Sequence, residues 1–311
     1  MNIIVLGAAG FIGTNLAFAL SKEPENAITL VDRDYSFFSH IKEKKINRIK
    51  YRVSDLTCNT EFDDLLENQD VVYHLVSTTV PTTSNQHISE EVKANVLFSS
   101  NLFEACVRQK IKKVIFISSG GTVYGKEAQC PLSECAATDP ITSYGVQKIT
   151  IEKLLYLYNY LYGLDYRIIR LSNPYGPYQR PNGILGAVTT FTYKALKREI
   201  IEVFGDGTIV RDFIYIDDAI RGILNISNRG TNKLYNLGCG YGTSINEVLD
   251  TIELVLGEKL NIQYKESRKV DVPVNFLDIN RYEQEFGKLM PVSLFEGIKK
   301  SISFMKDNYQ L

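Results

Sequence analysis

The sequence predicts an α/β fold: a doubly wound parallel sheet followed by a smaller C-terminal α/β subdomain. Two observations support this. Short apolar runs alternate with longer amphipathic segments through the first half, and the alternation becomes irregular after the NPYGP turn at 173–177. Apolar strands separated by helices are typical of parallel sheets covered on both faces. With right-handed crossovers, any ligand is expected beyond the carboxyl ends of the strands.

The expected elements follow from these runs. Candidate strands are Asn2–Ala8, Ala27–Asp32, Ile49–Ser54, Val71–Ser77, Lys113–Ser119 and Tyr166–Leu171. Candidate helices in the first half are Phe11–Ser21, Thr60–Glu67, Glu90–Gln109 and Tyr144–Leu161. The second half is expected to hold a helix near Leu185–Lys197, a hairpin around Gly205-Asp206-Gly207, and helices at Asp217–Ile226 and Ile245–Leu256. We expect one domain over 1–173 and a second over 174–311, with part of 205–230 a candidate for returning to the first.

Composition narrows the class of protein. The chain has 35 basic and 36 acidic side chains, a formal net charge of -1, so neither a nucleic-acid nor a membrane partner is indicated. Its five cysteines form no CxxC pair and suggest reduced thiols in the cytoplasm, and its three scattered histidines indicate no zinc site. The N-terminus lacks the basic region of a signal peptide, and no apolar stretch approaches the ~20 residues that span a bilayer. A soluble cytoplasmic protein is therefore expected.

The segment GAAGFIG, from Gly7 to Gly13, follows the first predicted strand and opens the first predicted helix. In such a turn the first glycine allows a tight bend, the second lets the backbone approach a pyrophosphate, and the third packs helix on strand. Gly10, Phe11 and Ile12 would present helix amides to that anion. Turns also require glycine for conformational reasons alone, so the triplet by itself is a weak signal.

Asp32 strengthens this signal, because it ends the second strand roughly 20 residues further on, where a carboxylate binds the adenosine ribose hydroxyls. The negative charge of Asp32 disfavours the 2′-phosphate of NADP, so NAD is expected as the cofactor. Arg33, the next residue, is the one feature here that would favour that phosphate. Asp55 and Leu56 close the third strand and are expected beside the adenine; a helix or turn cap is the alternative role for Asp55. The sequence therefore predicts a dinucleotide-binding (Rossmann) domain at 1–173.

Tyr144 and Lys148 form a second chemical signal. They lie four residues apart at the start of a predicted helix and share one face. Free tyrosine titrates near ~10, and moving the pKa to ~7 requires about 4 kcal/mol of differential stabilisation. The lysine ammonium and a positive nicotinamide ring are expected to supply it. The phenolate would then take a proton from a sugar or alcohol hydroxyl as hydride leaves for the cofactor. YxxxK also occurs by accident, and its place after the fifth strand is what favours catalysis.

Five motifs occur in a fixed order: GAAGFIG, SSGGTVYG, SYGVQK, SNPYGPYQRP and VRDFIYIDD. Together they resemble the extended short-chain dehydrogenases/reductases, and most of all the NAD-dependent nucleotide-sugar epimerases and dehydratases of the UDP-glucose 4-epimerase type. The resemblance covers nearly the whole chain. It implies NAD as the cofactor, a substrate-binding second domain, and NAD contacts from Gly7, Gly10, Gly13, Asp32 and Asp55.

The resemblance also implies individual roles around the substrate. Tyr144 would be the base, Lys148 would bind the nicotinamide ribose, and Asn173 would contact the substrate diphosphate or sugar. Arg211 and Arg268 would clamp the diphosphate, because planar guanidinium groups pair bidentately with phosphate oxygens. Surface ion pairs are the alternative roles of the two arginines, with Asp212 and Asp271.

One position departs from the relatives' pattern. They carry a serine or threonine three residues before the valine of VYG, whose hydroxyl shares the substrate proton with the tyrosine. Here that position is Gly120. Ser119 and Thr122 are the candidate replacements, and Thr122 is favoured because the paired glycines let the backbone bring it inward. Alternatively, these hydroxyls only bond loop amides.

Two further positions bear on the substrate. Nucleotide-sugar 4,6-dehydratases of this type carry an adjacent Asp-Glu pair where this chain has Gly121 and Thr122, so water elimination is not expected. Asn275 lies where relatives use residue size to shape the sugar pocket. An asparagine leaves room for UDP-N-acetylhexosamines as well as UDP-glucose and UDP-galactose; a polar loop residue is the alternative.

The helix containing ITIEKLLYLYNYLYG is apolar or aromatic nearly all round, whereas a helix buried on one face shows a polar stripe. The resemblance implies a homodimer formed through this helix and the one near Glu90–Gln109. A monomer with the tyrosines packed under the second domain is the alternative.

The expected function is that of an NAD-dependent nucleotide-sugar 4-epimerase, acting on a UDP-hexose or UDP-N-acetylhexosamine through a transient 4-keto sugar. A nucleotide-4-keto-6-deoxysugar reductase or a dehydrogenase is the alternative, because Gly120 lacks the usual hydroxyl and reduction needs only one proton donor. A third hypothesis is a non-catalytic NAD-sensing protein, against which the presence of Tyr144 and Lys148 counts.

Overall fold

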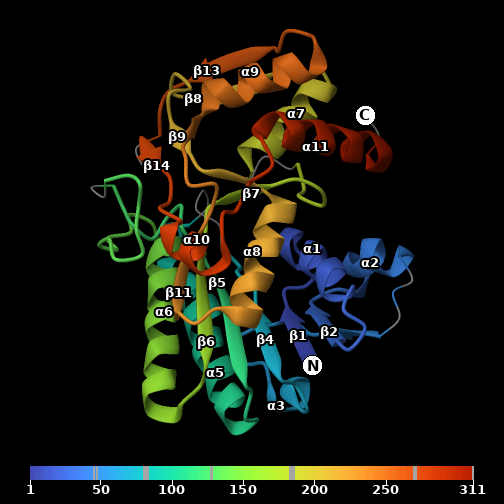
Figure 1. Ribbon diagram of the computed structural model, residues 1–311, viewed down its shortest axis with the longest axis vertical. Helices are drawn as coiled ribbons and strands as arrows, with labels where there is room; N and C mark the ends of the chain where they lie inside the picture. The colour runs from blue at the N-terminus through green and yellow to red at the C-terminus, as the bar shows by residue number, and fades with distance from the viewer. Residues whose placement is uncertain are drawn as a thin grey trace. The chain divides into compact units, whose positions relative to one another are not determined.

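The computed structural model describes residues 1–44, 46, 48–79, 84–126, 129–181, 186–268 and 272–309 (Figure 1). The chain forms two compact units. Unit 1 comprises residues 1–119, 142–169 and 223–234, and unit 2 comprises 120–141, 170–222 and 235–311. Neither unit is a continuous stretch of sequence.

A seven-stranded sheet confirms the predicted fold class. Its strand order is β11-β6-β5-β4-β1-β2-β3, and the pairs β1–β2, β2–β3, β1–β4 and β4–β5 are parallel. The strands are β1 (Asn2–Leu6), β2 (Ala27–Asp32), β3 (Ile49–Val53), β4 (Val71–His74), β5 (Lys113–Ser119), β6 (Tyr166–Leu171) and β11 (Leu234–Leu237).

The register brings three strand ends of unit 1 to the same level. Leu6, the last residue of β1, pairs with Val31 on one side and His74 on the other. β1 ends there, before the expected Ala8, because Gly7 turns the chain with a φ of 82°. β4 likewise ends before the expected Ser77. The loops that follow β1, β2 and β4 therefore start at one edge of the sheet, where parallel sheets bind ligands.

The helices of unit 1 lie between these strands. They are α1 (Phe11–Leu20), η1 (Tyr35–Phe38), α2 (Ser39–Glu43), α3 (Asp63–Leu66), α4 (Ile88–Val92), η2 (Lys93–Leu97), α5 (Phe98–Arg108) and α6 (Ser143–Tyr162). The expected helix at Glu90–Gln109 is a run of three segments, with the π-helical η2 between α4 and α5. The expected helix at Thr60–Glu67 is the short α3.

The core of unit 1 is a large apolar cluster between the sheet and the helices α5 and α6. It includes Phe98, Leu102 and Phe103 of α5 and Ile151 and Leu155 of α6, all buried. Figure 1 shows α5 and α6 side by side along the strands, and the two helices are in contact. Each fully buried side chain of this size contributes ~1.5–3 kcal/mol by leaving water, so this packing fixes α6 on the sheet.

α6 has defined signals at both ends. The N-cap Thr142 accepts a hydrogen bond from the Gly145 amide through its side chain, and Gly163 ends the helix in the left-handed region with a φ of 73°. A threonine N-cap and a glycine after the last turn are the residues that helix ends favour. The 20-residue helix therefore starts at a fixed place, which decides where Tyr144 lies.

Unit 2 contains three small sheets. β7 (Asn173–Tyr175) pairs with β10 (Phe213–Tyr215), and β8 (Ile201–Phe204) pairs with β13 (Ile262–Lys265), both in parallel. β9 (Val210–Arg211) lies between β12 (Thr243–Ser244) and β14 (Val274–Asn275). The expected hairpin around residues 205–207 is wrong, because β8 and β9 on either side of that turn pair with strands of different sheets.

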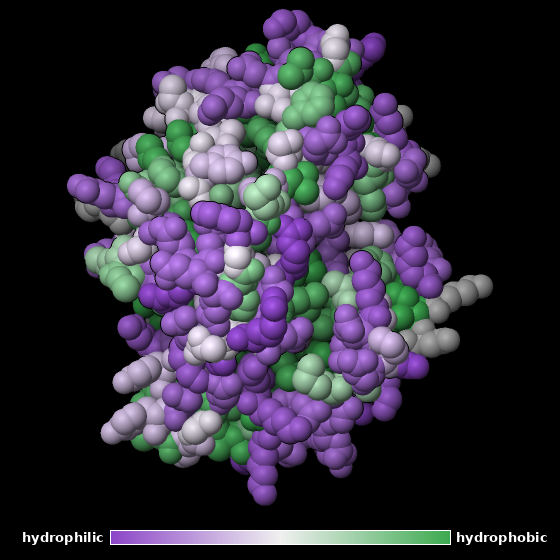
Figure 2. All heavy atoms as spheres, viewed as in Figure 1, coloured by the Kyte–Doolittle hydropathy of each residue, from purple (hydrophilic) through white to green (hydrophobic). Residues whose placement is uncertain are grey.

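The helices of unit 2 are α7 (Ala187–Leu196), α9 (Ile245–Leu256), α10 (Asn280–Phe286) and α11 (Leu294–Asn308), and α8 (Ile216–Arg229) continues from unit 2 into unit 1. α7, α9 and α11 contact one another. The first residue of the helix expected near Leu185–Lys197 lies outside the described residues. Within the described part of the chain, no helix has the length and apolar character that crossing a membrane requires. Hydrophilic side chains cover most of the face drawn in Figure 2.

A test of this fold uses Gly13, where α1 packs most closely on the loop after β1. A Cβ at Gly13 would lie 2.6 Å from the carbonyl oxygens of both Gly7 and Ala8. Gly13→Ala is expected to destabilise the nucleotide-free protein by ~1–3 kcal/mol through overpacking, measured as a lower thermal midpoint. Gly10→Ala is the matched control, because its Cβ would lie 3.4 Å from the nearest heavy atom. Equal midpoints for the two variants would contradict the close packing.

Candidate functional site

The loop after β1 is held against the end of β2. The amides of Gly7 and Ala8 both donate to the Val31 carbonyl oxygen, at 3.0 and 3.1 Å. The Ala9 amide donates to Oδ2 of Asp32 at 2.9 Å. The two features that sequence reasoning linked, the glycine loop and Asp32, are therefore in direct contact within unit 1.

The start of α1 has the properties of an anion-binding site for the predicted cofactor. The N-cap is Gly10, so no side chain caps the amides of the first turn, which include those of Phe11 and Ile12. A Cβ on Gly10 would meet only the Gly7 carbonyl oxygen, at 3.4 Å, so the backbone there is open to a close approach. Both observations fit a dinucleotide pyrophosphate at this helix N-terminus.

The remaining cofactor candidates lie after β3. The Asp55 side chain is exposed, and its backbone carbonyl accepts from Oγ1 of Thr60 at 3.4 Å. Leu56 is buried in the apolar cluster of unit 1. Because β3 pairs with β2, Asp55 and Leu56 follow the same edge of the sheet as Asp32.

Tyr144, Lys148 and Ser119 come together in unit 1. Tyr144 and Lys148 occupy successive turns at the start of α6, and Ser119 is the last residue of β5. Lys148 is buried; its Nζ donates to the Ile117 carbonyl oxygen at 2.9 Å and lies 5.5 Å from the centre of the Tyr144 ring. The Ser119 side chain lies near enough to the Tyr144 phenol to lower its pKa. The predicted Tyr-Lys pair and one of the two candidate hydroxyls thus form one cluster.

The surroundings of this cluster shift the pKa values of both Tyr144 and Lys148. Burial raises the pKa of Tyr144 to about 12, and the nearby Ser119 side chain lowers it only in part. Burial also lowers the pKa of Lys148 to about 8, against the opposing charge of Glu152. The expected lowering of the Tyr144 pKa depends on Lys148 together with the positive nicotinamide ring, and it stays a prediction. Removal from water outweighs the neighbouring ammonium, which the Ile117 carbonyl and Glu152 already engage.

Glu152 is a member of this cluster that sequence reasoning missed. It is buried one turn after Lys148, and its Oε1 accepts from Oγ of Ser118 at 2.5 Å. The signal was present in the sequence, because residues 148 and 152 share a helix face with Tyr144. Ser118, one residue before Ser119 on β5, donates to this carboxylate.

Unit 2 groups several of the predicted substrate residues around the segment 120–122. A Cβ on Gly121 would lie 3.7 Å from Oδ1 of Asn173. Asn275 is buried, and its Nδ2 donates to the Gly120 carbonyl oxygen at 3.4 Å. Oγ1 of Thr122 is buried and has no hydrogen-bond partner among the described residues. Within unit 2 the chain therefore brings Thr122, Asn173 and Asn275 to one place.

The absence of a side chain at Gly120 has a steric cause. A Cβ there would lie 2.6 Å from Cδ1 of Leu277 and 3.2 Å from the Arg170 carbonyl oxygen. Leu277 is fully buried, so its side chain is enclosed by other atoms, and its backbone amide donates to Oδ2 of Asp212. The usual serine or threonine has no space in this chain.

Arg211 lies beside this group, because it is the register partner of Asn275 across β9 and β14, whereas Arg268 follows β13. Nη1 of Arg211, on β9, donates to the carbonyl oxygens of Val210 and Val272 at 2.8 and 2.6 Å. Arg268 is exposed, and its guanidinium carbon lies 3.5 Å from the centre of the Phe204 ring. Asp271, the alternative partner of Arg268, lies outside the described residues.

Comparisons with known proteins agree with this arrangement. Residues 3–238 match the model of the "NAD dependent epimerase/dehydratase family". The chain is 34% identical over 307 residues to a putative UDP-glucose 4-epimerase of Methanocaldococcus jannaschii, covering 98% of this chain and 99% of the relative. It is 32% identical over 321 residues to a dTDP-4-dehydro-6-deoxyglucose reductase of Escherichia coli, covering 98% of each.

A solved structure is similar over the whole chain. The UDP-glucuronic acid 4-epimerase of Bacillus cereus, in complex with UDP-glucuronic acid and NAD, has a TM-score of 0.91 and 30% sequence identity, covering 99% of this chain and 100% of that one. The glycine loop with Asp32, the Tyr144–Lys148 pair and these matches lead to one conclusion. The chain belongs to the NAD dependent epimerase/dehydratase family.

Proposed function

We propose that the protein is an NAD-dependent 4-epimerase of nucleotide sugars, acting on a UDP-hexose or a UDP-N-acetylhexosamine. The observation that carries the proposal is the Tyr144 ring, whose centre lies 5.5 Å from Nζ of the buried Lys148, with Ser119 beside the phenol. This arrangement suits the removal of a proton from a sugar hydroxyl and its return. The reaction would pass through a 4-keto sugar that rotates in the site, so that hydride returns to its other face.

The chain's residues would divide the work as follows. The loop Gly7–Gly13 and Asp32 would hold NAD, and Lys148 would bind its nicotinamide ribose. Bound NAD would accept hydride from C4 of the sugar and give it back. Tyr144 would take the O4 proton and return it to the epimer, so no net proton or hydride is consumed. Because burial raises the pKa of Tyr144 to about 12, its ionisation needs a positive charge beside the ring in addition to Lys148.

The structure supports Ser119 over Thr122 as the hydroxyl that assists Tyr144. Ser119 lies in unit 1 near the phenol and lowers the pKa of Tyr144, whereas the sequence alone favoured Thr122. Leu277 explains why the usual position, Gly120, carries no hydroxyl. Thr122 keeps an unpartnered buried oxygen, which suits a hydrogen bond to the bound substrate.

The substrate itself would be held by residues of unit 2. Arg211 and Arg268 would bind the diphosphate, because guanidinium forks match phosphate oxygens. Asn173 and Asn275 would contact the sugar, and both side chains lie beside the 120–121 backbone. A small amide at residue 275 favours a pocket that accepts N-acetylated as well as simple hexoses.

Reduction of a nucleotide-4-keto-6-deoxysugar is the second candidate function. The relative in Escherichia coli that bears a reductase name favours it, since the identity extends over almost all of both chains. A reductase would release its oxidised cofactor after every turnover, whereas an epimerase would retain it.

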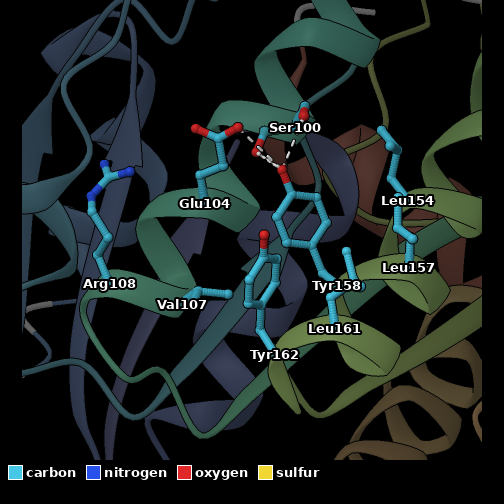
Figure 3. Close-up of a pocket in the computed structure, with 9 residues that line it drawn as sticks. All are labelled: Ser100, Glu104, Val107, Arg108, Leu154, Leu157, Tyr158, Leu161 and Tyr162. Carbon is cyan, nitrogen blue, oxygen red and sulfur yellow. Dashed lines mark hydrogen bonds between the residues drawn. The ribbon is translucent and has the colours of Figure 1, made fainter.

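We also propose that two copies of the chain associate through α5 and α6. Along α6, Tyr156, Leu157, Tyr160 and Leu161 are between 45% and 77% exposed. A groove of about 420 Å³ lies between the two helices (Figure 3). At its floor the Tyr158 hydroxyl hydrogen-bonds Ser100 and Glu104. Apolar helix faces of this kind suit burial against a second copy.

We propose that the protein is located in the cytoplasm. Its free cysteine thiols suit the reducing conditions there.

The first experiment is proton NMR of UDP-, dTDP- and GDP-hexoses, including N-acetylated forms, incubated with the protein as purified and without added cofactor. Appearance of a C4 epimer is expected. Tyr144→Phe should lower kcat by ~10²–10⁴-fold, the range of general acid–base catalysis, and Ser119→Ala should cost more than Thr122→Ala in kcat. Turnover only of 4-keto sugars with added NADH or NADPH would instead establish the reductase.

The Gly120–Leu277 contact predicts a coupled pair of substitutions. Gly120→Ser should destabilise the protein by ~1–3 kcal/mol through overpacking, and Leu277→Ala by ~2–5 kcal/mol through the cavity it leaves. The double variant should lose less than the sum, since each change relieves the other. Urea unfolding of the wild type, the two single variants and the double variant measures these losses. Additive losses of unfolding free energy would show that Leu277 does not occupy the space that a side chain at residue 120 needs.

Dimerisation predicts that Leu157→Glu lowers the mass in solution. Light scattering after gel filtration should give twice the chain mass of 35.2 kDa for the native protein and a smaller average for the variant. Leu254→Glu is the control, because Leu254 is 71% exposed on α9 in unit 2. A native protein that elutes as a monomer, or equal dissociation of both variants, would overturn the assignment.

A further inference from the structure

A buried carboxylate lies beside the helix turn that carries Tyr144. Glu91, on the short helix α4, is 8% exposed. Its Oε2 accepts from Oγ of Ser143 at 2.6 Å and from Nε2 of Gln147 at 3.1 Å. These two residues lie immediately before Tyr144 and immediately before Lys148 in the sequence. The carboxylate therefore binds the first turn of α6 on both sides of the tyrosine.

The hydrogen bonds continue from Gln147 into the loop after β4. Nε2 of Gln147 also donates to Oγ of Ser143 at 2.8 Å, and its Oε1 accepts from Nδ2 of Asn95 at 2.7 Å. Oδ1 of Asn95 accepts from the Thr78 amide at 2.9 Å. The network thus joins α6 to the edge of the sheet where the cofactor loops begin.

Two details indicate that this network has a purpose beyond filling space. Asn95 lies in the π-helical segment η2, a local departure from α-helix that is frequent at functional sites. Asn85, from the same stretch of chain, accepts from the Ser143 amide at 2.7 Å. Three side chains of the stretch 84–97 therefore bond the start of α6, at the backbone amide of Ser143 and at the side chains of Ser143 and Gln147.

We propose that Glu91 is a positioning residue for Tyr144, acting through Ser143 and Gln147. Charge-assisted hydrogen bonds to a buried carboxylate are short and directional, so they fix the rotation of the first turn of α6. That rotation sets the place of the phenol relative to Ser119 on β5. The proposal rests on the proposed function of Tyr144, whereas the coupling between Glu91 and α6 does not.

The kinetic test compares Glu91→Ala and Glu91→Gln with the control Glu90→Ala. Glu90 is the exposed neighbour of Glu91 in the same first turn of α4. Glu91→Ala should lower kcat by about 10- to 100-fold with little change in KM, because small misplacements of a catalytic group cost up to ~10²-fold. Glu91→Gln keeps an acceptor oxygen, so its kcat should lie between those of Glu91→Ala and the wild type. The kcat of Glu90→Ala should equal that of the wild type.

A double-variant comparison tests the route through Gln147. If Glu91 acts through Gln147, the combined Glu91→Ala/Gln147→Ala variant should lose less in kcat than the product of the two single losses. Multiplicative losses would overturn that route. Where Glu91→Ala fails to fold, Glu91→Gln and Ser143→Ala carry the same comparison.

Hydrogen exchange of the cofactor-free protein supplies a readout that needs no turnover. Amides in 142–149 should exchange faster in Glu91→Ala than in the wild type, those in 150–162 should be unchanged, and Glu90→Ala should leave both alone. Unchanged exchange in 142–149, or wild-type kcat in a folded Glu91→Ala protein, would overturn the proposal. Absence of turnover by the wild type on every nucleotide sugar would instead refute the proposed function, and exchange would still decide the role of Glu91.

Discussion

One hydrogen bond, from the Lys148 ammonium to the Ile117 carbonyl oxygen, holds the cluster of Tyr144, Lys148 and Ser119 in place on the sheet. It crosses from α6 to β5 two residues before Ser119, so it holds the helix that bears the phenol against the strand that bears the hydroxyl. The lysine is buried, and burial lowers its pKa to about 8. Glu152, one turn further along α6, favours the charged form. The positive charge at the site is therefore maintained by a carboxylate on its far side.

The features that the sequence predicted are those with a local cause. Continuous apolar runs predicted the bounds of β2, β5 and β6 as the structure has them, since buried parallel strands need no partner-specific pattern. The glycine loop and Asp32 were recognisable because a tight turn and a nucleotide-binding carboxylate each demand a particular residue type. The Tyr144–Lys148 pair followed from helix geometry alone.

The features that the sequence did not predict depend on contacts between distant segments. Leu277 fills the space at Gly120, and no pattern near either residue signals the other. No pattern near Glu91 signals its partners, and only the fold brings it to Ser143 and Gln147. Burial raises the pKa of Tyr144 for the same reason: a sequence shows that a lysine is one turn away, but not how the fold surrounds the phenol.

The course of the chain through the two units has a consequence for how the protein is made and altered. Unit 1 is complete only when residues 223–234 have been synthesised. Unit 2 begins at residue 120 and ends at residue 311. During synthesis neither unit can be completed before most of the polypeptide exists, so folding depends on contacts between ends far apart along the chain. No single cut yields either unit intact. An exchange of one whole unit between relatives would have to replace several segments of the chain together.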